Sequence, residues 1–167
     1  MTERVVSVDR ATLVPRPPEW QPGSAAAHRF DAARALLGAT LGLQKLGVSV
    51  IQVAPGRSAY PFHSHRANDE LFFMLSGRGE LRLGQARHAV QAGDLVGCPA
   101  GGPDSAHQLV NSGTEPLRDL AVSTQIDPEI CEYPDSGKAG ACAGDDEPGE
   151  LMHLTRYGQA LDDWDGE

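Results

Sequence analysis

Two short stretches of the chain concentrate side chains that bind metal ions. His63 and His65 are two residues apart, so on an extended segment both imidazoles project from the same face. Glu70 stands five residues after His65, and His107 supplies a third imidazole further along the chain. Imidazole suits Zn, Cu, Fe and Ni, and a carboxylate adds Mn. The sequence therefore predicts one divalent metal ion, with Zn, Mn, Fe or Ni as the candidates, held by these four residues and open to water or substrate.

The elements that must position these ligands are expected to be short strands. The chain has 19 glycines and 12 prolines, and this many turn-forming residues favours strands over long helices. Apolar runs separated by turn signals every 8–12 residues indicate an all-β sandwich or barrel. The predicted strands are residues 41–46, 48–53, 70–75, 80–83, 88–90, 94–98, 107–110 and 117–124.

The two ligand-bearing stretches resemble the paired motifs of the cupin superfamily. The first contains Gly56, His63, His65, Glu70 and Gly77, with one residue more before His63 than the family pattern. The second contains Gly93, Pro99, Gly101, His107 and Asn111, with three residues more between Gly101 and His107 than the pattern. Because the longer loop of the second motif immediately precedes His107, its extra length affects the position of this side chain relative to the other three ligands.

The resemblance covers roughly residues 40–125. It implies an antiparallel double-stranded β-helix, a jelly-roll-like barrel that holds its metal ion inside. The segment around Lys138 extends the likeness to a group of uncharacterised single-domain cupins, some of which carry the name "putative sugar-phosphate isomerase". Lys138, or Arg57 beside the first motif, is predicted to bind a substrate anion, because basic side chains are effective phosphate partners.

Three functions stay open at this point. A metal-dependent enzyme would use the ion to polarise a small polar substrate, as an isomerase does. The sequence identifies no general base for such an enzyme, and Tyr60 is a candidate without further support. An Fe(II)-dependent dioxygenase is the alternative within the same class, since such sites use two histidines and one carboxylate. A binding protein without catalysis would use the same ion and an apolar pocket wall, to which Phe72 and Met74 are expected to contribute.

The chain divides into three expected regions within a single domain. Residues 1–39 form an extended N-terminal arm with a short helix around residues 30–37, and residues 40–126 form the barrel. Residues 127–167 form an acidic extension with a hairpin over residues 129–133 and 138–142, followed by a loop over 143–150. This extension carries 2 basic and 12 acidic residues, whereas residues 1–126 carry 12 and 11. The simplest interpretation of the extension is a solvated, solubilising segment.

Composition also limits the partners. A net charge of −9 without a basic stripe argues against nucleic-acid binding, and no apolar stretch approaches the length of a membrane span. Three cysteines without CxxC spacing and no visible secretory signal favour the cytoplasm. Residues 70–76 are apolar on both faces apart from Glu70, so the outer face needs a cover, either the N-terminal arm or a second subunit. A homodimer is the expectation, beside the small-molecule ligand.

Overall fold

Strands dominate the computed structural model, as the abundance of turn formers predicts. It describes residues 4–15, 26–144, 151–159 and 161–166. The strands are β1 (Val14–Pro15), β2 (Ala32–Leu36), β3 (Leu46–Val53), β4 (Ser64–His65), β5 (Glu70–Ser76), β6 (Arg78–Leu83), β7 (Ala86–Gln91), β8 (Leu95–Cys98), β9 (His107–Val110), β10 (Leu117–Thr124), β11 (Glu129–Tyr133), β12 (Lys138–Ala143) and β13 (Leu151–Arg156). The helical turns are η1 (Val8–Arg10), α1 (Gly38–Leu41), η3 (Pro103–Ser105) and η4 (Pro134–Ser136).

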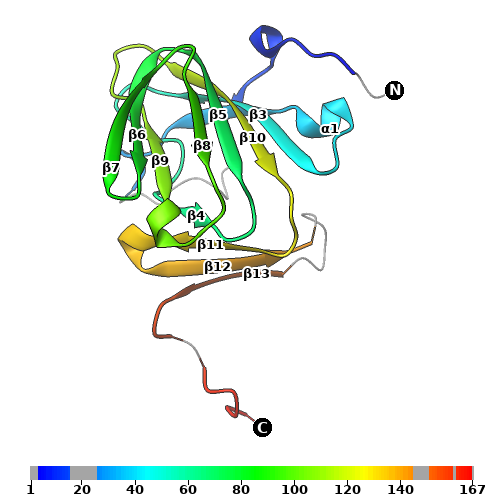
Figure 1. The fold of residues 1–167 in the computed structure, drawn as a ribbon, viewed down its shortest axis with the longest axis vertical. Coiled ribbons are helices and arrows are strands. Elements are labelled where there is room, and N and C mark those ends of the chain that lie inside the picture. The colour runs from blue at the N-terminus through cyan, green and yellow to red at the C-terminus, as the bar shows by residue number, and fades with distance from the viewer. Residues whose placement is uncertain (1–3, 16–25, 145–150, 160, 167) are drawn as a thin grey trace.

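The strands form three antiparallel sheets within the described ranges. The largest has the order β1-β2-β3-β10-β5-β8, and a three-stranded sheet β7-β6-β9 stands opposite it (Figure 1). The third sheet, β13-β12-β11-β4, runs across the ends of the other strands in the lower part of the view. The sheets do not close into one continuous barrel, but their arrangement is the double-stranded β-helix that the motifs imply, so the predicted fold class is confirmed.

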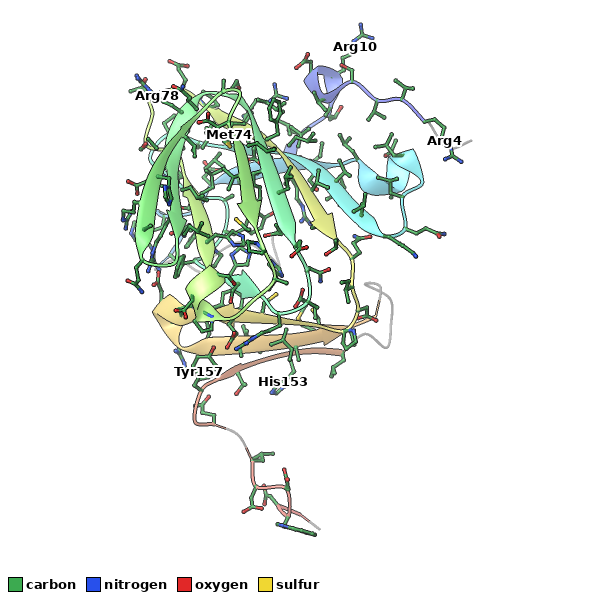
Figure 2. The ribbon with its side chains drawn as sticks, viewed as in Figure 1. Arg4, Arg10, Met74, Arg78, His153 and Tyr157 are labelled. Carbon is green, nitrogen blue, oxygen red and sulfur yellow. The ribbon has the colours of Figure 1, made fainter. Side chains whose placement is uncertain are left out.

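The core lies between the six-stranded sheet and the three-stranded sheet β7-β6-β9, and strand alternation explains its composition. Met74, Val53 and Leu117 are fully buried on β5, β3 and β10, and side chains two residues apart on a strand share a face. Figure 2 shows Met74 among the strands of the upper part of the fold. On β5, Glu70 and Phe72 share the face of Met74 and point toward this interior. The strand therefore places Glu70, a predicted metal ligand, on the inner face of the sheet.

A second apolar cluster covers part of the outer face of the large sheet. Ala35, Leu37 and Val50 are buried there, and residues of the N-terminal segment pack against them. Leu75 of β5 belongs to the same cluster, whereas Phe73 and Leu71 on that face remain 38% and 36% exposed. The N-terminal segment thus supplies one of the two expected covers for β5, and only for part of the strand.

Two of the expected local elements are wrong. Residues 30–37 do not form a helix: Ala32–Leu36 pair with β3 as strand β2, because tertiary pairing outweighs the helix propensity of the alanines. Residues 41–46 do not form a strand. Leu41 is the last residue of α1, Gly42 caps this helix with a φ of 72°, and β3 begins only at Leu46. The prolines of residues 16–25 and most of the expected loop over 143–150 lie outside the described residues.

Candidate metal centre

The backbone brings the two ligand-bearing stretches into direct contact. The amide of His63 donates to the carbonyl of His107 at 3.1 Å, and the amide of His107 donates to the carbonyl of His63 at 2.7 Å. This two-residue bridge lies next to β4, whose Ser64–His65 pair with β11. His107 is therefore fixed opposite the HxH segment, and the longer loop before it, which contains η3, does not displace it.

Three of the four predicted ligands converge on one point. Ligand atoms of His63, Glu70 and His107 all lie within 4.8 Å of one another. His107 Nε2 is 2.7 Å from Glu70 Oε2, and the rings of His63 and His107 are 4.7 Å apart between centroids. One ion at this point would replace the direct contact between His107 and Glu70.

His65 lies at the edge of this group. Its Nε2 is 3.5 Å from Glu70 Oε2, and this buried atom has no hydrogen-bond partner among the residues that the structure describes. An imidazole nitrogen buried without a partner costs free energy. His65 Nε2, beside the carboxylate, is therefore suited to be a fourth ligand atom. The set of three imidazoles and one carboxylate suits a divalent transition metal.

The charges of the group are strongly coupled. Burial, together with His107 and His65, lowers the pKa of His63 to about 4, so this imidazole is neutral at neutral pH. Burial also opposes protonation of His107, but the neighbouring Cys98 and Glu70 side chains outweigh it and raise the His107 pKa. Despite its own burial, Glu70 has a lowered pKa because His107 hydrogen-bonds to it. Metal binding must displace the proton shared by His107 and Glu70.

Glu129, in the acidic extension, holds the loop that joins His65 to Glu70. Its Oε1 accepts hydrogen bonds from the amides of Arg66 and Ala67 at 3.0 and 3.1 Å. Its Oε2 accepts from the amide of Asn68 at 3.0 Å and from the Asn68 side chain. The lowered pKa of Glu129 follows from these bonds, which outweigh its partial burial. The sequence analysis missed this residue. Glu129 lies at the start of a predicted strand, but the whole acidic extension was interpreted as a solvated segment.

Other described residues of the extension also contact this loop or His65. Arg66 Nε forms an ion pair with Glu132 Oε2 at 2.7 Å, and the Tyr157 hydroxyl donates to Glu132 Oε1 at 2.8 Å. Cys131 Sγ is 3.4 Å from His65 Nδ1. Tyr157 lies at the end of β13, on the side of that strand facing the fold in Figure 2. Part of the acidic segment is therefore structural and forms one wall of the site.

A cavity of 590 Å³ opens onto the candidate ligands His63 and Glu70, which together with His107 we call the metal group. His63, His65, Glu70 and Phe72 line it, and Tyr60, Cys131, Tyr133, Ser49, Ser123 and Arg34 are also among its lining residues. The Tyr133 ring stacks on His63 with 6.2 Å between centroids and 19° between planes.

Only one of the four expected substrate-binding residues reaches this cavity. Phe72 lines it, whereas Met74 is fully buried in the core behind it. Arg57 is not among the lining residues, since it lies at the turn after β3, where its carbonyl accepts from the amide of Asn111. Lys138 is also not a lining residue; its Nζ lies 5.3 Å from the centroid of the Tyr133 ring.

Comparison with known proteins agrees with this geometry. The model of the family described as "Cupin domain" matches residues 49–123. This range contains the HxH segment, Glu70 and His107 on the strands described above. Residues 49–123 form a cupin domain. The fold and the family predicted from the paired motifs are thereby confirmed.

Two solved structures extend the likeness beyond the matched domain. A cupin superfamily sugar phosphate isomerase from Silicibacter pomeroyi is 25% identical, with a TM-score of 0.78 over 96% of this chain and 98% of the other. The "Putative sugar phosphate isomerase" of Acidithiobacillus ferrooxidans is 27% identical, with a TM-score of 0.69 over 78% of this chain and 80% of the other. An uncharacterized protein of Methanocaldococcus jannaschii is 31% identical over 84 residues, and this match spans 48% of this chain and 65% of that protein.

The helices of the described residues are all too short or too polar to cross a bilayer.

Proposed function

We propose that this cupin is a metal-dependent enzyme that isomerises a sugar phosphate, with His63, His65, Glu70 and His107 as the metal ligands. The observation that carries the proposal is the convergence of His63, Glu70 and His107 within 4.8 Å, with His63 and Glu70 at the wall of a cavity. The unpartnered Nε2 of His65 beside this group supports a fourth ligand. The names of the two related solved structures support the substrate class.

The side chains around the cavity suit a polyhydroxylated ligand. A divalent ion bound at the group would polarise a carbonyl or hydroxyl oxygen of the substrate. Burial raises the pKa of Cys131 to about 12 and also raises the pKa of Tyr133. Both groups keep their protons at neutral pH and act as donors. Ser49 and Ser123 add hydroxyl groups to the wall, and the Phe72 ring gives it an apolar surface.

Deuterium exchange tests the proposal. Aldose–ketose isomerisation moves a proton between neighbouring carbons, so turnover in D₂O places deuterium on the sugar carbon. We expect the metal-loaded protein to convert glucose 6-phosphate or ribose 5-phosphate to the ketose with deuterium at C1, observed by NMR. Glu70→Gln should abolish the reaction, and His88→Ala, which changes an exposed histidine outside the site, should not. Binding of both sugars without exchange or ketose would instead support a binding protein.

A second candidate function has its own observation. The group within 4.8 Å consists of two histidines and one carboxylate, which is the donor set of non-haem Fe(II) oxygenases. An Fe(II)-loaded protein that consumes O₂ with an organic substrate, and does not isomerise sugar phosphates, would favour this dioxygenase over the isomerase.

We also propose that the protein is a cytoplasmic homodimer. All three cysteines are free thiols, which suits a reducing compartment. Leu95 of β8 is 65% exposed opposite Phe73 of β5, which is 38% exposed, and apolar side chains gathered on one sheet face mark interaction surfaces. Sedimentation velocity should show a dimer, and Leu95→Glu should shift it to the monomer. A wild-type monomer at micromolar concentration would contradict the proposal.

A further inference from the structure

Among the described residues, one arginine faces the cavity from β2, three strands away from the strand that carries Glu70. Arg34 of β2 lines the cavity together with His63, His65 and Glu70. It stands opposite Ile51 of β3, which in turn stands opposite Asp119 of β10. Side chains at one register position across neighbouring strands point to the same face. Because Ile51 belongs to the core cluster, Arg34 points to the inner face of the large sheet.

No acidic side chain among the residues that the structure describes pairs with Arg34. No other Lys or Arg is among the described residues that line the cavity. Arg34 is half-buried, and no hydrogen bond, ion pair or ring contact of its guanidinium is found within the described part of the chain. A guanidinium is always protonated and offers five donors in a planar fork, which matches phosphate and carboxylate oxygens in pairs. A half-buried cation without a partner costs free energy, and a bound anion would offset this cost.

Hydroxyl groups lie on the inner face between Arg34 and the metal group. Ser123 of β10 stands opposite Glu70, and Ala121 on the same strand stands opposite Ser49 of β3. Both serines line the cavity. A ligand that reaches from Glu70 to Arg34 crosses from β5 over β10 and β3 to β2, so it must be elongated. Its middle would face serine hydroxyls, and its far end would face the guanidinium.

We infer that Arg34 binds the terminal phosphate of the substrate while the opposite end of the sugar lies at the metal group. This inference rests on the proposed function and assigns the anion subsite to Arg34 instead of Arg57 or Lys138. An ion pair with the phosphate adds binding free energy at a point remote from the reacting carbons. The site should therefore prefer phosphorylated sugars to the same sugars without phosphate.

Calorimetric titration of the full chain tests the subsite with fructose 6-phosphate, fructose and inorganic phosphate as probes. Arg34→Gln should weaken fructose 6-phosphate binding at least tenfold and leave fructose binding unchanged. Arg34→Lys, which keeps the charge and loses the fork, should fall between. Arg10→Gln is the matched control, because Arg10 is exposed on the N-terminal segment, away from the cavity (Figure 2). Equal affinity of wild type and Arg34→Gln for fructose 6-phosphate, or no binding by wild type, would overturn the inference.

The same titrations separate this inference from the proposed function. Metal affinity of Arg34→Gln should equal that of wild type, since Arg34 is not a ligand. If the phosphate preference depends on Arg34 but the loaded protein forms no ketose, the subsite stands and the isomerase proposal fails. If ketose forms and Arg34→Gln keeps the wild-type KM, the isomerase proposal stands and the subsite fails.

Discussion

The carboxylate of Glu129 lies 3.5 Å from Nδ1 of His65, so a residue of the C-terminal extension contacts the back of a predicted metal ligand. Carboxylates in this position orient ligating histidines and keep the opposite nitrogen available to the metal. The same carboxylate accepts the amides of the loop that leads to Glu70. Glu129 thus connects His65 and the loop before Glu70, which carry two of the predicted ligands, to β11.

Replacing Glu129 with alanine should weaken both the fold and the metal site. The amides of Ala67 and Asn68 would lose their acceptor, whereas the amide of Arg66 keeps the carbonyl of Ile130. Each unsatisfied buried donor costs about 1–3 kcal/mol. We expect Glu129→Ala to lower the free energy of unfolding by about 2–4 kcal/mol, measured in urea, and to lower metal affinity at least tenfold. Glu129→Gln keeps an oxygen acceptor and should recover most of the stability. A Glu129→Ala protein with wild-type stability and metal affinity would show that the carboxylate positions nothing.

Gly77 is required by the turn between β5 and β6. Its φ is +82°, and a Cβ at this position would lie 2.7 Å from the carbonyl oxygen of Pro116. Gly77→Ala should therefore destabilise the protein by about 2–4 kcal/mol, from left-handed strain and overpacking together. Gly97 has open space around its Cβ position and no positive φ, so Gly97→Ala should change stability by less than about 0.5 kcal/mol. Equal urea midpoints for the two variants would refute this account of the turn.

Asp119 makes stability depend on pH. It is 1% exposed, neither carboxylate oxygen has a hydrogen-bond partner among the described residues, and burial with a contribution from Glu70 raises its pKa to about 7. The folded state thus binds the Asp119 proton more tightly than the unfolded state, whose carboxyl titrates near 4. Its contribution to stability is greatest below pH 4 and is lost as the pH rises to about 7.

Comparison of metal-free wild type with Asp119→Asn isolates this contribution. The difference in unfolding free energy between the two proteins should change by on the order of 3 kcal/mol from pH 5 to pH 8, with wild type losing relative stability at the higher pH. The remaining ionisable groups are the same in both proteins, so the comparison removes their contributions to the pH dependence. A difference that stays constant over this range would mean that Asp119 is ionised throughout.

The candidate ligand residues were predictable because they are close together in the sequence, at a characteristic spacing. His63, His65 and Glu70 fall within eight residues, and Gly77 follows at a turn that only a residue tolerant of positive φ can make. The side chain of Asn111, in the second motif, donates to the carbonyls of Val53 and Glu115. Strands β9 and β10 begin and end at the predicted residues.

The residues that the sequence did not reveal act across long separations. Glu129 reaches the site because β11 pairs with β4, and a net negative charge over residues 127–167 gave no sign of this pairing. Arg34 reaches the cavity because β2 pairs with β3, whereas a short helix was expected around residues 30–37. Cross-strand pairing decides both placements, and local composition carries no information about it.

Metal binding by the purified, untagged protein tests the central claim most directly. Protein stripped with a chelator is dialysed against Mn²⁺, Fe²⁺, Ni²⁺ or Zn²⁺, and the bound metal is counted by elemental analysis. We predict one ion per chain for wild type and for His88→Ala, with at least a tenfold loss of affinity in His63→Ala and in His107→Ala. No bound ion in wild type, or one ion retained at unchanged affinity in both ligand variants, would contradict the account.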